Sequence, residues 1–438
     1  EQVLAGMRVP PDFEASPGTR IDFIHRVVGD TDLYFVSNQR YRTEDLECTF
    51  RVAGKVPELW YPDTGKTEPA LVYRVVGGRT VVPLRLDPAG TVFVVFRKRL
   101  SPTLHFATVQ APGVGKTARP SQLVIRRAVY EAVDGAGSAD VTARLQAMVR
   151  NGTLSVNVNN ITMGGDPTPF HYKRLRVEYT LDGKEYSIIV NENADLDIPA
   201  RETAGAIPAY SVRLLPNARV ELLAWRAGDY TLRLPSGKTI RVRNDRSAQV
   251  MPVTGKWTVR FPKGRGAPEK VVFDRLISWT EHPHPGVRYF SGTARYEKAL
   301  QIPPSWIVPN QRLYLSLGEV KNLCEVWLNG KYLGILWKPP FRVDITDVVR
   351  PGLNRLEVHV TNLWVNRLIG DEQYPDDCEW QGSQLKAFPH WFVEGKPRPV
   401  PQRLTFTTWK HWQKDDPLRP SGLLGEVEVY AVRSHSIK

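Results

Sequence analysis

The residues most able to do chemistry lie in one stretch, TNLWVNRLIGDEQYPDDCEW, at positions 361–380. Indole rings can stack on the C–H face of a sugar while Asn and Arg side chains pair with its hydroxyls. This pattern makes Trp364, Asn366 and Arg367 candidate sugar-binding residues. Carboxylates are also the hard oxygen ligands that calcium prefers, and four candidates for such a site follow: Asp371, Glu372, Asp376 and Asp377.

A structural use of the same stretch is the stronger interpretation. If the strand that ends in RLEVHV continues, Trp364 and Asn366 share one side of it, and Arg367 and Asp371 follow beyond. An arginine whose planar guanidinium is held by a carboxylate is a common structural clamp. The sequence therefore favours a clamp or domain interface, ahead of direct sugar contact and ahead of a bound cation.

No catalytic set is visible in the sequence. Hydrolysis of a glycosidic bond by inversion needs two carboxyls about 6.5–9.5 Å apart across the sugar. The pairs Asp371-Glu372 and Asp376-Asp377 are adjacent, and neighbours on an extended chain point to opposite faces. Neither pair can flank one bond by itself, while convergence of carboxylates from separate loops stays open.

Two other motifs are rejected. GVGKT at 113–117 lacks the earlier glycine of a phosphate loop, because Gln110 stands there, and Arg119-Pro120 replaces the helix that should follow. His282 and His284 lie in a proline-broken loop with no third ligand, which is typical of a solvated loop rather than a metal site.

Further tryptophans extend the list of sugar-binding candidates. In LCEVWLNG one side of the predicted strand is apolar, and Trp327 lies on the opposite side. Trp409 likewise lies opposite the apolar side of RLTFTTWKHW. Trp279, Glu281 and Tyr289 bracket a long loop that could form a pocket wall.

Composition excludes several classes of protein. The net charge is +13, but the basic residues are spread thinly along strand-like stretches, so we expect no nucleic-acid partner. No apolar run approaches the roughly 18 residues of a membrane span. The three cysteines are far apart and odd in number, which excludes a disulfide scaffold, and the alternation predicts that Cys48 and Cys324 are buried.

The elements that position these residues are strands. Period-two alternation recurs in stretches such as TVFVVF, RLRVEYTL, CEVWLNG and EVEVYAV, with Gly-containing hairpin turns between them. One helix is predicted, in SADVTARLQAMVRNG, with Leu145 on its apolar face. The fold class is therefore all-β, with several β-sandwich or jelly-roll domains and one short helix-containing insertion.

Composition shifts divide the chain into four units. We expect a β-sandwich-type domain at 1–112, an inserted α+β unit at 118–207, a small β unit at 208–268 and a jelly roll at 269–438. The last unit holds nine of the twelve tryptophans. The chain begins at Glu1 with neither an initiator Met nor a signal peptide, which predicts a mature or cut product.

Two sets of motifs resemble known proteins. The run from LYLSLGEVKNLCEVWLNG to GLNRLEVHVTN resembles the galactose-binding-type jelly roll of large glycoside hydrolases. IDFIHRVVGDTDLYFVSNQ with GKVPELWYPDTGK, and NLWVNRLIGDEQYPDD with RLTFTTWKHWQKDDPLRPSGLLGEVEVYAV, resemble the C-terminal half of glycoside hydrolase family 106, the α-L-rhamnosidases. The resemblance covers about 1–112 and 208–438.

The resemblance implies a carbohydrate-associated function. Family members carry a catalytic barrel and a calcium-dependent site before the PPDFE…IHR segment, which here begins near residue 10, so no catalytic residue carries over. We expect a non-catalytic sandwich portion that binds rhamnose-containing glycans, with calcium as the candidate cofactor and a barrel domain or chain as a candidate partner. The resemblance also implies a secreted or periplasmic location. The alternatives are a hydrolase with an inter-domain carboxylate site and a structural surface protein without sugar affinity.

Overall fold

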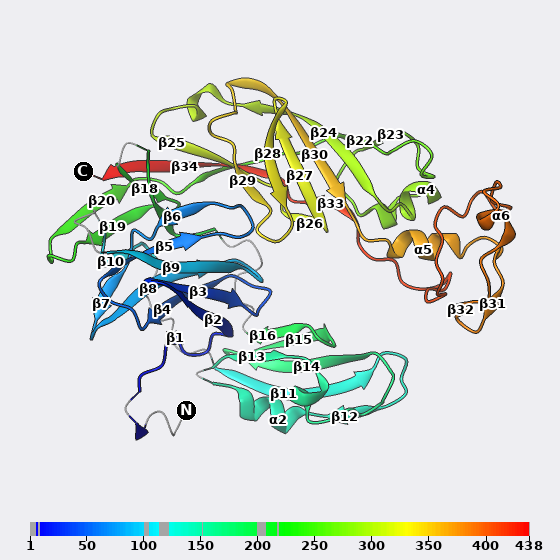
Figure 1. Ribbon diagram of the computed structural model, residues 1–438, viewed down its shortest axis with the longest axis horizontal. Helices are drawn as coiled ribbons and strands as arrows, with labels where there is room; N and C mark the ends of the chain where they lie inside the picture. Colours follow the sequence, from blue (N-terminus) through cyan, green and yellow to red (C-terminus); the bar gives the residue numbers. More distant parts are fainter. Residues whose placement is uncertain are drawn as a thin grey trace. The chain divides into compact units, whose positions relative to one another are not determined.

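A computed structural model describes residues 6–7, 9–99, 105–113, 122–150, 152–198, 207–216 and 219–437 (Figure 1). The chain forms two compact units. The first unit consists of Glu1–Ala209 and Tyr230–Arg241, and the second unit consists of Tyr210–Asp229 and Val242–Lys438. Antiparallel sheets dominate both units, so the predicted all-β class is confirmed. No helix in the described part of the chain is long and apolar enough to cross a membrane.

The first unit opens with a two-sheet sandwich. One sheet has the order β1 (Phe13–Ala15), β4 (Glu44–Phe50), β8 (Arg79–Leu86), β7 (Arg74–Val76). The other has the order β2 (Ile21–Val28), β3 (Thr31–Asn38), β9 (Thr91–Arg99), β5 (Lys55–Trp60), β6 (Thr67–Pro69). Alternate side chains of both sheets form one core, in which Cys48 is fully buried as the alternation predicts.

A separate core belongs to the segment predicted as an insertion. Its main sheet has the order β12 (Ser138–Asp140), β11 (Leu123–Ala132), β14 (Lys173–Leu181), β15 (Lys184–Asn191). The predicted helix is α2 (Thr142–Met148), whose Leu145 is fully buried. The strands β13 (Leu154–Asn157) and β16 (Asp195–Ile198) and the short helix α3 (Asn160–Met163) complete it.

The second unit is also a sandwich. One sheet has the order β23 (Lys270–Phe273), β22 (Trp257–Arg260), β24 (Thr293–Ile302), β30 (Gly352–Thr361), β27 (Leu323–Leu328), β28 (Lys331–Leu336). The other has the order β17 (Tyr210–Leu214), β18 (Val220–Ala224), β34 (Glu428–Ile437), β25 (Gln311–Ser316), β29 (Arg342–Asp344), and β21 (Gln249–Pro252) also pairs with β34. Between them lies the largest core, which contains the fully buried Cys324.

The segment expected as a small β unit, 208–268, forms no sheet of its own. Its strands β17, β18 and β21 join the sheet of the C-terminal strand β34, and β22 joins the opposite sheet. The strands β19 (Gly228–Arg233) and β20 (Thr239–Asn244) form a third sheet with β10 (Thr108–Gln110). The expected breaks at 112–118 and near 207 fall largely outside the described residues, so the fourfold division stays a prediction.

Candidate functional site

The motif-rich stretch does not continue as a strand. Strand β30 ends at Thr361, and after a short turn the helix α5 (Val365–Asp371) begins, with Trp364 at its N-cap. The chain then leaves the two sheets, passes through α6 (His390–Val393) and returns at β33 (Gly422–Gly425), as the orange segment in Figure 1 shows. We call residues 362–421 the excursion.

Two asparagines fasten the ends of the excursion together. Asn362 donates to the Phe290 carbonyl (2.9 Å) and to Ser421 Oγ (3.0 Å). Asn366 donates to the same hydroxyl (2.9 Å) and to the Arg419 carbonyl (2.7 Å). Both asparagines are more than nine-tenths buried, so Asn366 serves the backbone and is not free to contact a sugar.

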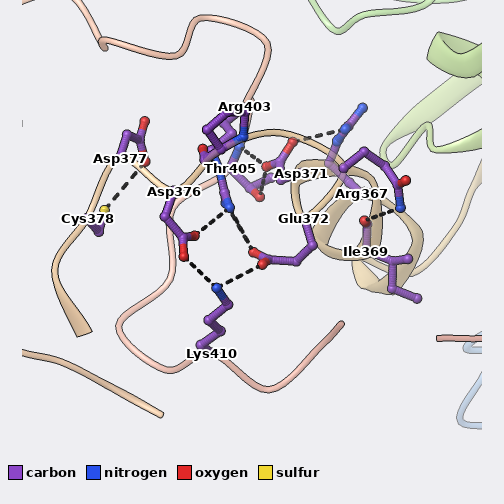
Figure 2. Close-up of polar contacts among 12 residues, drawn as sticks. Arg367, Ile369, Asp371, Glu372, Asp376, Asp377, Cys378, Arg403, Thr405 and Lys410 are labelled. Carbon is purple, nitrogen blue, oxygen red and sulfur yellow. Dashed lines mark hydrogen bonds and ion pairs between the residues drawn. The ribbon is translucent and has the colours of Figure 1, made fainter. Parts of the chain in front are cut away.

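Arg367 and Asp371 form the clamp that the sequence favours. Arg367 Nη2 lies 2.9 Å from Asp371 Oδ1, and both side chains are buried. Asp371 also accepts hydrogen bonds from the backbone amides of Leu404 (3.0 Å) and Thr405 (2.7 Å), which links α5 to the returning chain (Figure 2). A side chain at Gly370 would meet Tyr289 Cβ at 2.5 Å, so this close approach requires glycine. The prediction of Arg367 as a sugar contact is therefore wrong, because the side chain is enclosed.

A second arginine neutralises the next two carboxylates. Arg403 donates to Glu372 Oε1 at 3.0 Å and to Asp376 Oδ1 at 2.7 Å, and its own side chain is only 6% exposed. Lys410 Nζ bridges the remaining oxygens of the same residues, at 3.2 Å from Glu372 and 2.7 Å from Asp376 (Figure 2). Burial alone would lower the pKa of Lys410, but its hydrogen bonds to Asp376 and Glu372 outweigh that effect and raise it.

The fourth carboxylate has its own arginine. Arg398 donates to both oxygens of Asp377 and also to the carbonyls of Arg403 (2.9 Å) and Thr405. Burial raises the pKa of Asp377, but the hydrogen bonds and charge of Arg398 outweigh it and hold the pKa below its ordinary range. The Asp377 carboxylate therefore stays ionised and paired at neutral pH.

These partners correct the prediction of a metal site at Asp371, Glu372, Asp376 and Asp377. Each carboxylate is already held by a guanidinium or ammonium group, as described above. Among the described residues, no group of three or more His, Cys, Asp or Glu side chains could hold a metal ion. A calcium ion at this cluster would have to displace Arg403 and Lys410, so the residues do not fit it.

The remaining sugar-binding candidates lie in three different settings. Trp279 is fully buried and donates to Tyr296 Oη, so the prediction that it lines a pocket is wrong; the loop folds inward and the indole packs in the core. Glu281 is exposed and Tyr289 is half-buried, and a sugar contact by these two residues stays a prediction. Trp364 and Trp409 are 72% and 57% exposed, and Trp327 is half-buried on the face of a sheet.

Trp409 is the exposed tryptophan that lies in a pocket. Its indole nitrogen donates to Ser383 Oγ at 3.1 Å, and its backbone bridges to Gln384. The ring lines a shallow pocket of the excursion together with these residues: Gln384, Leu385, Lys386, Ala387, Phe388 and Thr408. Here an exposed aromatic face lies beside amide, hydroxyl and ammonium groups, which is the chemistry that a sugar needs.

Sequence reasoning missed Arg398, Arg403 and Lys410 as partners of the carboxylates. They lie between 21 and 38 positions after the carboxylates that they bind, within turns rather than in a recognisable motif. One signal was available: residues 371–379 contain five acidic side chains and no Lys or Arg. Because buried carboxylates require nearby cations, basic partners from elsewhere in the chain could have been expected.

Family models match three parts of the chain. Residues 1–75 match the α-L-rhamnosidase model of glycoside hydrolase family 106, and residues 246–387 match the sugar binding domain of glycosyl hydrolases family 2. Residues 115–199, which cover most of the predicted insertion, match the C-terminal region of DnaJ-like protein C11.

Two individual proteins are similar along nearly the whole chain. The solved structure of a rhamnosidase from Novosphingobium sp. PP1Y has a TM-score of 0.53 and 27% identity, and covers 98% of this chain but only 26% of its own. A Formosa agariphila protein named "Putative beta-glucuronidase" is 31% identical over 99% of this chain and 45% of its own length. This chain thus spans less than half the length of that curated relative. The predicted resemblance to α-L-rhamnosidases is confirmed, and the chain contains glycoside hydrolase-related β domains, one of which matches a sugar binding domain.

Replacing Arg403 should destabilise the protein strongly. Arg403→Met keeps the aliphatic stem but removes the guanidinium from Glu372 and Asp376. Because Lys410 still neutralises both carboxylates, we expect the cost of the lost charge-assisted hydrogen bonds alone, about 1–3 kcal/mol. The matched control is Lys386→Met, whose pair with Glu379 is exposed on both sides, so this variant should change the stability much less than Arg403→Met does. Urea unfolding followed by circular dichroism measures both, and equal effects would contradict the network described here.

The pairing of the four carboxylates with basic side chains can be tested with calcium. Because Arg403 and Lys410 occupy the carboxylates, we expect neither EDTA nor added calcium to change the melting temperature. An ion bound only by the native state, at a hundredfold excess over Kd, would add about 2.7 kcal/mol and raise the melting temperature. Such a rise with calcium, absent with magnesium, would restore a calcium site to the chain.

Proposed function

We propose that this chain is the sugar-binding sandwich portion of an α-L-rhamnosidase-like glycoside hydrolase and binds rhamnose-containing glycans without cleaving them. The observation that carries the proposal is the likeness to the Novosphingobium rhamnosidase along 98% of this chain, at 27% identity. The match of residues 246–387 to a sugar binding domain supports the carbohydrate ligand. Because the likeness covers 26% of the rhamnosidase, the activity of that whole protein is not transferred.

The state of the carboxylates supports a non-catalytic role. A glycosidase needs one carboxyl that gives up a proton and a second that acts as base or nucleophile. In the excursion, the four candidate carboxylates are held by Arg367, Arg398, Arg403 and Lys410. Arg398 holds the pKa of Asp377 below its ordinary range, so that carboxyl is ionised and is not a general acid at neutral pH.

The pocket at Trp409 is the surface that we assign to the sugar. The indole offers a stacking platform, and Gln384, Lys386 and Thr408 offer donors and acceptors at its rim. The hydrogen bond to Ser383 fixes the ring, so less side-chain entropy is lost when a ligand stacks on it.

We further propose that the chain works outside the cytoplasm beside a catalytic barrel domain or chain, as the resemblance to family 106 implies. The second candidate function is that of a glycoside hydrolase whose carboxyl pair lies elsewhere in the chain. The observation that favours it is the relative named as a β-glucuronidase, which is 31% identical across 99% of this chain.

Sugar binding should be weak and should depend on Trp409. A stacking platform with two or three hydrogen bonds, each contributing about 0.5–1.5 kcal/mol, predicts a millimolar to high-micromolar Kd for a monosaccharide. Trp409→Ala should raise the Kd for methyl α-L-rhamnoside about three- to tenfold, which corresponds to the loss of an aromatic contact. Ligand-observed NMR titration gives the Kd, and Tyr41→Ala, an equally exposed aromatic in the first unit (60% against 57%), is the control. Unchanged binding by Trp409→Ala would remove this pocket from the proposal.

Turnover separates the two candidate functions. We expect the purified chain to release no aryl group from an aryl α-L-rhamnoside or an aryl β-glucuronide, because Asp371, Glu372, Asp376 and Asp377 are each held by a basic side chain. Release that continues through repurification and is lost when a carboxyl outside the excursion is replaced would establish the hydrolase instead.

A further inference from the structure

We propose a second sugar-contacting surface, on the outer face of the six-stranded sheet, that binds a neutral 6-deoxyhexose residue through Trp327, Tyr332, Glu325 and His359. This inference rests on the proposed sugar-binding function but concerns a different place in the fold. Three neighbouring strands build the surface: β27, β28 and β30 (Figure 1). We call it the sheet-face site.

The strand register brings the four side chains together on the solvent side. Cys324, Val326 and Leu328 of β27 point into the core and are fully buried, so Glu325 and Trp327 point outward. Across the ladders, Glu325 is opposite His359, and Trp327 is opposite Tyr332. Residues directly opposite each other share one face of a sheet, so these groups form a single surface.

The aromatic rings form a supported platform. The Trp327 ring centroid lies 4.0 Å from that of His359 and 5.0 Å from that of Tyr332, with both pairs tilted. Trp327 is half-buried by these neighbours, while Tyr332 is 48% exposed. A ring that is held from both sides keeps its orientation, which lowers the entropy cost of stacking a sugar against it.

Two polar groups beside the platform have unused hydrogen-bonding capacity. Glu325 is half-buried and has no hydrogen-bond or ion-pair partner among the described residues. His359 Nε2 is buried without a hydrogen bond and lies 3.8 Å from the Glu357 carboxylate. Burial lowers the pKa of His359, so the imidazole is neutral at pH 7 and keeps one donor and one acceptor. The Glu325 carboxylate is a suitable partner for sugar hydroxyls, whereas His359 Nε2 is enclosed and the imidazole ring supports Trp327 by packing against it.

The charges around the platform favour a neutral ligand. The outer face carries three arginines and three glutamates: Arg260, Arg295, Arg355, Glu297, Glu325 and Glu357. The arginines are engaged by Glu297 (3.0 Å from Arg260 and 2.9 Å from Arg295) and by Glu357 (3.1 Å from Arg355). With Glu325 included, the three guanidinium groups and three carboxylates balance, so these six groups give the face no net charge to attract a uronic acid or a sulfated sugar. The Glu325 carboxylate, which none of these arginines engages, disfavours an anionic group placed directly beside it.

An exposed aliphatic side chain narrows the class of sugar. Ile335 lies directly opposite Glu325 on β28 and is 49% exposed. A 6-deoxyhexose has a methyl group where other hexoses have a hydroxymethyl, and burying that methyl against Ile335 is favourable. The same contact would leave a hydroxymethyl with a poorly paired hydroxyl.

Titration of variants with methyl α-L-rhamnoside tests the sheet-face site. In the Trp409→Ala chain, which lacks the loop platform, we expect residual binding that Glu325→Gln or Trp327→Ala weakens at least threefold. Glu325→Gln is isosteric and keeps the sheet intact, so it remains decisive if Trp327→Ala fails to fold, as judged by circular dichroism. The control is Glu319→Gln, which removes an exposed carboxylate paired with Lys321. We also expect methyl β-D-glucuronide to bind this surface more weakly than the rhamnoside, and Glu325→Gln to reduce that difference.

The outcomes distinguish this inference from the proposed function. If Trp409→Ala abolishes binding, and Glu325→Gln and Trp327→Ala titrate like the unaltered chain, the sheet-face site is wrong and the loop pocket stands. If the unaltered chain binds no neutral sugar, both fail. Equal affinity for the rhamnoside and the glucuronide at the sheet face would overturn the assignment of a neutral ligand.

Discussion

A carboxylate that leaves water must find a cation or several hydrogen-bond donors, and this constraint organises the excursion between β30 and β33. Asp371, Glu372, Asp376 and Asp377 lie on one side of the segment, and the returning chain brings Arg398, Arg403 and Lys410 to meet them. Ser421 then closes the base by accepting from Asn362 and Asn366. With little regular secondary structure of its own, the excursion is held in place largely by these charged and polar contacts.

The same constraint decides which side chains remain available to a ligand. Every polar residue used inside the network is lost as a sugar contact, and this removes Asn366, Arg367 and the acidic residues from the candidates. Among the sugar-binding candidates of the excursion, the two that remain exposed are aromatic: Trp364 at the N-cap of α5 and Trp409 on the returning chain. A network that rigidifies the segment also fixes the Trp409 pocket, so the structural role of the acidic stretch serves binding indirectly.

The sequence predicted those features that depend on local periodicity. Alternation identified the strands, the all-β class, the helix α2 and the burial of Cys48 and Cys324, because a two-sided sheet imposes a period of two on each strand. It failed after Thr361, where a polar stretch was read as a strand and the chain forms α5. The helix buries Asn366 and Asp371, whose backbone partners at Arg419 and Thr405 lie more than 30 residues away, and no local pattern records such partners. Trp279 was misplaced for a similar reason, since only the folded loop places its indole beside Tyr296.

Trp327 shows how a residue can satisfy the structural and the functional interpretation together. Its place opposite the apolar side of β27 was predictable, but its neighbours His359 and Tyr332 come from β30 and β28, and only the register of the sheet brings them to it. If the cross-strand cluster only stabilised the sheet, it would not need an unpaired carboxylate beside it. A half-buried, unpaired Glu325 lowers the stability of the fold unless a ligand forms hydrogen bonds with its carboxylate. In the excursion, basic side chains of the same segment pair with the buried carboxylates. On the sheet face, no side chain of the described residues pairs with Glu325. That contrast within one domain is the physical reason to look for a ligand at the sheet face as well as at the loop.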